Sequence, residues 1–200
     1  MITFEGLDQQ MRAFSRELHD EVGLESMGAA KIATTLAAEV RYLDRPSKDT
    51  VLKASPVPLV ARIEELRAFQ AWMELAAGEK CPAIVRAQVI VQSYVCFVYL
   101  GEPCFRALRT VSKADSLTRR CSELLTNKSV RAFRNAFAHS SWMYNPDFSG
   151  LMYWARKGES KDEQMIQFEV SATQLEFWQA LSRTFAYSAF TSLQSVTGMS

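Results

Sequence analysis

Histidine is scarce in this chain of 200 residues, and the usual metal-binding cysteine pairs are absent. It has two histidines and four cysteines, and no two cysteines stand in a Cys-x-x-Cys pair, which argues against a zinc site of the usual spacing. Cys96 and Cys121 have apolar neighbours and are expected to act as small core residues. His19 has acidic neighbours but no second histidine nearby, which favours a surface or packed histidine over a ligand. The sequence therefore predicts neither a metal site nor a cofactor.

Long hydrophobic runs and an excess of charge are also missing. The longest nearly apolar run, residues 89–100, is too short to span a membrane and is interrupted by Gln92 and Ser93. The start, MITFEGLDQQMR, lacks the basic residues and apolar stretch of a signal peptide. The net charge of +1 provides no overall basic field for nucleic acid. We therefore expect a cytoplasmic protein without a membrane partner, in which any basic patch is local.

Helical periodicity dominates the chain, and it predicts a mainly α fold, a helical bundle in one domain of residues 1–200. Residues 1–45 are expected to form additional N-terminal helices. Residues 46–58 are expected to form a loop, because Asp44 to Pro58 holds three prolines and few apolar residues. The core bundle is expected over residues 59–200. Asp115 or Ser116, and then Ser129, are candidate N-caps of two of its helices.

A small β-hairpin is predicted just before the last helix, at about residues 150–171. The segments LMYWAR and MIQFEVS are short, aromatic and branched, and a polar loop separates them. The closing helix follows, with Thr173 and Glu176 as a candidate capping box. Its apolar stripe consists of Leu175, Trp178, Leu181, Phe185 and Phe190.

Basic residues gather between Arg106 and His139. The segment has eight basic residues and only two acidic ones, Asp115 and Glu123, so its net charge is +6 in a chain whose total is +1. Such a patch can attract a phosphate backbone. Alternatively, several of these side chains form a solvated helix face or pair with carboxylates elsewhere. The eight are Arg106, Arg109, Lys113, Arg119, Arg120, Lys128, Arg131 and Arg134.

One helical stretch within this segment, VRAFRNAFAHSSW, contains Arg134, Asn135 and His139. Imidazole can act as a general acid or base near neutral pH, and arginine can bind a phosphate and offset developing charge. Together they suffice for metal-free cleavage of RNA by its own 2′-hydroxyl. Arg134 lies five residues before His139, about 140° round a regular helix. Contact between the two side chains within one helix therefore needs a bend at the helix end or a curled arginine side chain. Alternatively, a second copy of the helix in a dimer would bring an arginine and a histidine together.

The alternative interpretation is a helix-end histidine bonded to backbone, with Arg134 in a salt bridge, and the spacing alone does not decide between the two. Trp142 and Tyr144 could stack on bases, although packing in the core or a turn is favoured for Trp142.

The string RNAFAHSSW resembles the R-N-x-x-A-H signature of the HEPN superfamily of small helical-bundle proteins, common in prokaryotic defence and toxin systems. The resemblance covers about residues 59–195 and is strongest over residues 131–154. It implies a HEPN-like bundle whose motif helices pair in a homodimer. It also implies metal-independent endoribonuclease activity, with Arg134 and His139 catalytic and Asn135 in support.

Further expectations follow from the resemblance. RNA contacts are expected from Arg131, Lys128, Ser140 and Tyr144, with RNA as substrate and an antitoxin or regulatory protein as a further partner. Ser141 stands where some HEPN toxins carry a modified tyrosine, which makes that form of regulation doubtful here. Because many HEPN members do not cleave RNA, the alternative is a non-catalytic module that binds RNA, a nucleotide or a protein.

Overall fold

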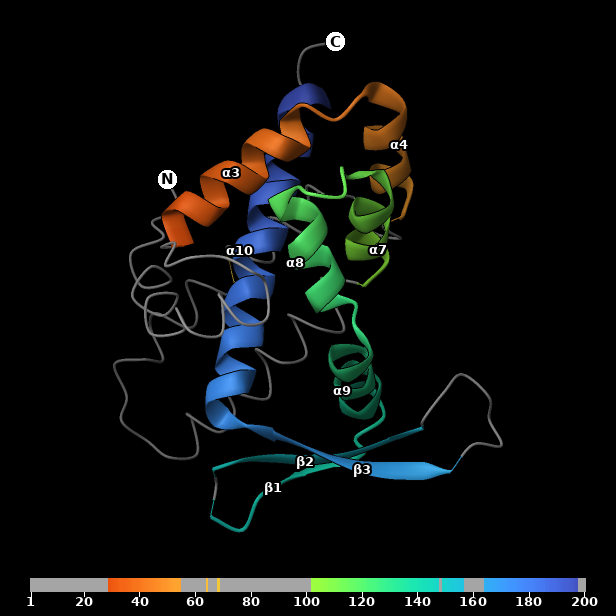
Figure 1. Ribbon diagram of the computed structural model, residues 1–200, viewed down its shortest axis with the longest axis vertical. Helices are drawn as coiled ribbons and strands as arrows, with labels where there is room; N and C mark the ends of the chain where they lie inside the picture. The colour runs from red at the N-terminus through yellow and green to blue at the C-terminus, as the bar shows by residue number, and fades with distance from the viewer. Residues whose placement is uncertain are drawn as a thin grey trace.

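The computed structural model describes residues 29–54, 64, 68, 102–147, 149–156 and 164–197, with side chains described between residues 31 and 193. These residues form six helices and three strands, so the fold is mainly helical with a small antiparallel sheet, as predicted (Figure 1). The helices expected before residue 29 and between residues 59 and 100 lie outside the described residues, apart from helical positions 64 and 68. No helix of the described part is both long and apolar enough to cross a membrane.

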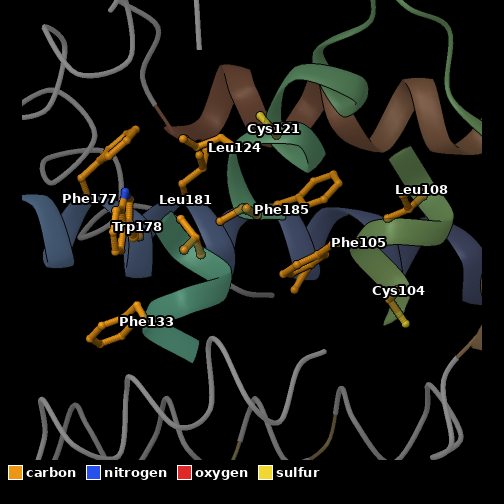
Figure 2. Close-up of a cluster of buried hydrophobic side chains, with 14 of the residues drawn as sticks. Cys104, Phe105, Leu108, Cys121, Leu124, Phe133, Phe177, Trp178, Leu181 and Phe185 are labelled. Atoms are coloured by element: carbon orange, nitrogen blue, oxygen red, sulfur yellow. The ribbon is translucent and has the colours of Figure 1, made fainter. Parts of the chain in front are cut away.

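The long C-terminal helix α10 (Ala172–Thr197) runs through the middle of the molecule, and α3 (Ala29–Arg41) packs along it at the end away from the sheet (Figure 1). Ile32, Leu36 and Val40 recur at four-residue steps on α3 and are fully buried. The predicted stripe of α10 is confirmed, since all five of its residues are buried. The close-up of the core shows Phe105, Leu181 and Phe185 among the buried side chains (Figure 2).

Residues 45–54 form a helix, α4 (Arg45–Ala54), so the loop predicted over residues 46–58 was wrong in its first part. The proline in this segment lies in the first turn, where its missing N–H costs nothing. Asp44 precedes the helix, and its Oδ1 accepts a hydrogen bond from Ser47 N at 2.8 Å, which caps the helix. The hydrogen bonds from Ser47 hold the pKa of Asp44 below its usual value. Residues 55–58 lie outside the described residues.

Three short helices lead to the sheet: α7 (Glu102–Val111), α8 (Leu117–Leu125) and α9 (Lys128–Ala138). Ser116 caps α8, as predicted, by accepting a hydrogen bond from Arg119 N. The cap predicted at Ser129 was wrong, because Asn127 accepts from Val130 N at 2.9 Å and begins α9 two residues earlier. Cys121 on α8 is fully buried, which confirms its core role, and burial raises the pKa of its thiol.

The predicted hairpin is confirmed as strands β2 (Gly150–Arg156) and β3 (Met165–Ser171), which pair antiparallel. A third strand, β1 (Trp142–Tyr144), adds to the other edge of β2, with Trp142 opposite Tyr153. The capping box predicted at Thr173 and Glu176 was wrong, because α10 begins at Ala172. Instead, the hydroxyl of Ser171 accepts a hydrogen bond from Gln174 N at 3.1 Å.

Candidate functional site

Helix α9, which carries the Arg-Asn-x-x-Ala-His string, is fixed to the sheet and to α10 by one apolar face. Val130, Phe133 and Phe137 are buried on that face. The ring of Phe133 meets the ring of Tyr153 of β2 edge-on at 5.3 Å and the ring of Trp178 of α10 at 5.9 Å. Figure 1 shows α9 lying directly beside the sheet. The polar residues of α9 are therefore held on its remaining, outward faces by a rigid support.

His139 stands at the C-terminal end of α9 with an exposed side chain. Its backbone N–H donates to Asn135 O at 3.1 Å, so the main chain closes the last turn. Among the described residues, its imidazole forms no hydrogen bond or ion pair. The alternative interpretation expected this histidine to be hydrogen-bonded to backbone, but only its main-chain N–H forms such a bond, and the exposed imidazole is accessible to solvent.

The residue after His139 ends the helix in an uncommon way. Ser140 has φ of 55°, in the left-handed region that favours glycine. Ser140 N donates to Phe137 O at 3.2 Å and Ser141 N to Ala136 O at 2.8 Å, the hydrogen bonds of a Schellman motif. Beyond it, the ring of Trp142 stacks on that of Phe137, with centroids 4.7 Å apart. Packing, rather than base stacking, is therefore the observed role of Trp142.

Arg134 forms an ion pair with a carboxylate from another helix. Its Nη2 lies 2.5 Å from Oε2 of Glu102, the first residue of α7, and Glu102 is 9% exposed. Burial lowers the pKa of Arg134, and the charge of Glu102 opposes this shift. The Nε atom of Arg134 is buried without a hydrogen-bond partner among the described residues. The salt bridge that the alternative interpretation expected for Arg134 is therefore present.

Two further arginines converge on the same carboxylate. Arg106, one turn along α7, forms an ion pair with Glu102 Oε1, and Arg131 Nε lies 3.7 Å from the same oxygen. We call Glu102, Arg106, Arg131 and Arg134 the Glu102 cluster. Three guanidinium groups and one carboxylate give it a formal charge of +2. The exposed fraction of the side chain is lowest for Glu102, at 9%, and higher for the arginines: 27% for Arg134, 35% for Arg131 and 51% for Arg106.

Arg134 and His139 border the same outward face of α9 from opposite sides. At about 100° per residue, Arg131 and Asn135 lie between them on that face, and Asn135 is exposed. Arg134 leans to the side of α7, where Glu102 holds it. No hydrogen bond or ion pair joins Arg134 to His139 in the part of the chain that the structure describes. The single chain therefore brings the motif residues to one face without joining them.

The rest of the basic segment is largely paired within the protein. Glu123 lies 2.6 Å from Nε of Arg119 and 4.0 Å from that of Arg109. Arg109 also donates to the hydroxyl of Thr126 at 3.4 Å, and Arg120 donates to Asp115 O at 3.2 Å. These contacts match the expectation that several basic residues pair with protein groups.

The other expected RNA contacts differ in their surroundings. Lys128 and Ser140 are exposed at the two ends of α9. Tyr144 lies on β1, where it is half-buried against the core and meets the ring of Trp142 edge-on at 5.6 Å. Among the described residues, no group of three or more His, Cys, Asp or Glu side chains is arranged to hold a metal ion.

Sequence reasoning missed Glu102, the residue at the centre of the Glu102 cluster. The glycine and proline of the string Gly-Glu-Pro at residues 101–103 are typical of the end of a helix. A glutamate followed by proline is also typical of the first turn of a helix, and α7 begins at Glu102. That signal would have predicted an acidic residue at the start of a helix. It would not have predicted that Arg131 and Arg134 of α9 are its partners, because they are distant in sequence.

Comparisons of the chain with protein-family models, with curated proteins and with solved structures find no significant match. The resemblance to the HEPN superfamily therefore depends on the RNAFAH string and its helical setting.

Proposed function

We propose that the protein is a metal-independent endoribonuclease of the HEPN type, acting in the cytoplasm in a prokaryotic defence or toxin–antitoxin response. The observation that carries the proposal is the exposed imidazole of His139 at the end of a rigidly supported helix, beside a cationic cluster that includes Arg134. A titratable group and a phosphate-binding charge on one surface are the two requirements of this chemistry.

In the proposed reaction, the 2′-oxygen of a ribose attacks the adjacent phosphorus as its proton passes to a base. The bond between phosphorus and the 5′-oxygen breaks, and that oxygen takes up a proton. The products are a 2′,3′-cyclic phosphate and a 5′-hydroxyl end, so no oxidant or other reactant is consumed. His139 would transfer protons, Arg134 would stabilise the charge on the phosphate, and Asn135 would support them.

A homodimer through α9 would complete the proposed site. Because Arg134 and His139 lie on opposite borders of one helix face, a second copy of that face would place the His139 of one subunit near the Arg134 of the other. Two histidines in one cleft would also divide the roles of base and acid. An antitoxin or regulatory protein would act by covering this face.

The second candidate is a non-catalytic module that binds RNA, a nucleotide or a protein. The observation that favours it is the ion pair between Arg134 and Glu102, because a guanidinium held at 2.5 Å by a buried carboxylate is already partly neutralised. Under this alternative, Arg134 stabilises the packing of α7 against α9, and His139 contacts the ligand without transferring a proton.

The experiment that separates the two candidates is the incubation of purified protein with several single-stranded RNAs in EDTA. The proposal predicts cleavage that survives chelation, leaves 2′,3′-cyclic phosphate ends, and fails on the same sequences made with 2′-O-methyl ribose. Intact RNA in every case, or cleavage that requires added metal, would contradict it. Binding of the 2′-O-methyl RNA without cleavage of the unmodified RNA would favour the non-catalytic module.

A further inference from the structure

The three-stranded sheet packs on the helices with one face only. Helices α9 and α10 lie against its core face, where the ring of Phe133 of α9 meets that of Tyr153 of β2 edge-on. Figure 1 shows the described helices on this one side of the sheet. We call the opposite side the outer face of the sheet. Because successive side chains of a strand point to opposite faces, every second residue of each strand lies on the outer face.

Apolar side chains from all three strands gather on the outer face. The pairing of the strands places Met143 of β1 beside Met152 of β2, and it places Trp154 and Met165 further along the same face. The side chains of Met143 and Met165 are 50% and 47% exposed, and those of Met152 and Trp154 are half-buried. Exposed apolar side chains that lie together, rather than singly, are typical of a surface that contacts another molecule. Methionine is common on such surfaces because its side chain adapts its shape.

Two residues of opposite charge stand at the two ends of the outer face. Arg156 of β2 and Glu169 of β3 each lie two residues from the Trp154–Gln167 pair, on opposite sides of it. The two ends are therefore about 13 Å apart along the strands. Arg156 is exposed and forms no ion pair or hydrogen bond in the part of the chain that the structure describes. Glu169 is also exposed, and its Oε1 accepts a hydrogen bond from Asn145 Nδ2 at 2.6 Å.

This pattern is complementary to itself under one twofold rotation. When a second copy lies face to face, with the axis between the sheets and perpendicular to the strands, the two ends exchange places. Each Arg156 then lies beside the Glu169 of the other copy, and Trp154 lies near the axis. An axis parallel to the strands would instead bring the two copies of Arg156 together, which like charges disfavour. The same patch on both subunits, complementary to itself, is the requirement for a symmetric pair.

We infer that the outer face of the sheet binds a second copy of this chain, face to face, with Arg156 of each subunit paired to Glu169 of the other. This interface does not include α9, so it is separate from the pairing in the proposed function and does not depend on it. From the dimensions of its strands, the outer face covers about 300 Å². A stable interface buries about 800 Å² on each partner, so association through the outer face is weak and increases with concentration.

The test measures the average mass in solution by sedimentation, from micromolar to millimolar protein. Arg156→Glu and Glu169→Arg are measured separately and then as an equimolar mixture. Alone, each variant brings like charges together at both contacts of the symmetric pair. In the mixture, every such contact joins an arginine to a glutamate again. Arg41→Glu, at an exposed position at the end of α3, is the matched control for the change of charge, and circular dichroism checks that every variant folds.

The inference predicts that the average mass of wild type and of Arg41→Glu rises with concentration. Each single variant of the outer face should reach no more than about half of the wild-type mass, and the mixture should recover it. If the proposed α9 dimer also forms, it persists in the single variants, because neither substitution lies on α9. Equal masses for wild type and the single variants would overturn the inference, and this is the result expected if a different protein or RNA occupies the outer face.

Met165→Glu provides an independent variant, because it adds a charge to the apolar part of the outer face and leaves the hydrogen bond between Asn145 and Glu169 in place. It should also reduce the average mass at high concentration. Association of Met165→Glu at the wild-type level would overturn the inference, as would a mixture of the two charge variants that fold but do not associate.

Discussion

Glu102 and Arg134 are joined by an ion pair of 2.5 Å between Oε2 and Nη2, which connects the first residue of α7 to the middle of α9. This pair gives the arginine of the motif a fixed position before any ligand arrives. A preorganised cation stabilises developing charge without first having to reorganise. The same pair also links two helices, so Glu102 affects both the stability of the fold and the site.

Replacing Glu102 by alanine should lower the free energy of unfolding by about 2 kcal/mol. The buried carboxylate is lost and three guanidinium groups are left facing one another, although their partial exposure to water limits the cost. Urea denaturation measures the effect. Glu123→Ala is the matched control, because Glu123 is 47% exposed in its pair with Arg119 and should contribute less than about 1 kcal/mol. Equal effects of the two substitutions would contradict the structural importance assigned to Glu102.

Ser140→Gly should stabilise the protein by up to about 1 kcal/mol. Ser140 adopts a φ of 55° at the end of α9, a conformation that glycine reaches without the steric cost of a Cβ atom. The gain is partly offset because glycine also makes the unfolded chain more flexible. Thermal denaturation of Ser140→Gly and of Ser140→Val checks the sign of the effect, because the valine variant should be less stable than wild type. A higher melting temperature for the valine variant would exclude the left-handed backbone at this position.

Glu39→Ala should destabilise the fold by about 1–2 kcal/mol, because Glu39 of α3 caps the N-terminus of α8. Its carboxylate accepts hydrogen bonds from Leu117 N at 2.9 Å and Thr118 N at 2.6 Å. Asp49→Ala, at an exposed position of α4, is the control and should change stability by less than about 0.5 kcal/mol. If both variants unfold at the same urea concentration, Glu39 does not cap α8 through these two hydrogen bonds.

Periodic patterns and local hydrogen bonding were sufficient to predict much of this fold. The stripe of α10, the hairpin of β2 and β3, and the cap at Ser116 depend on residues close in sequence, and all three are confirmed. Strand β1 has three residues, too few for an alternating pattern, and its pairing with β2 decides its conformation. Helix α4 was missed because proline usually breaks a helix, although the first turn tolerates it.

The site was less accessible to sequence reasoning. The face of α9 that carries Arg134 and Asn135 follows from helical spacing, but the partner of Arg134 does not. Glu102 comes from another helix, and no local rule relates it to α9. The left-handed backbone at Ser140 was equally hidden, because a serine there lacks the usual glycine signal. Long-range ion pairs and non-glycine helix ends depend on tertiary packing, which a single sequence does not display.

The measurement that tests the central claim most directly is the single-turnover cleavage rate of one RNA in EDTA, for wild type and for His139→Ala. His139 has an exposed side chain at the end of α9, so the variant is expected to fold, and circular dichroism verifies this. His19→Ala, which removes the other histidine of the chain, is the control. A proton-transfer role predicts a fall of about 10²- to 10⁴-fold for His139→Ala and wild-type rates for His19→Ala. Cleavage at the wild-type rate by His139→Ala would contradict the proposed active site.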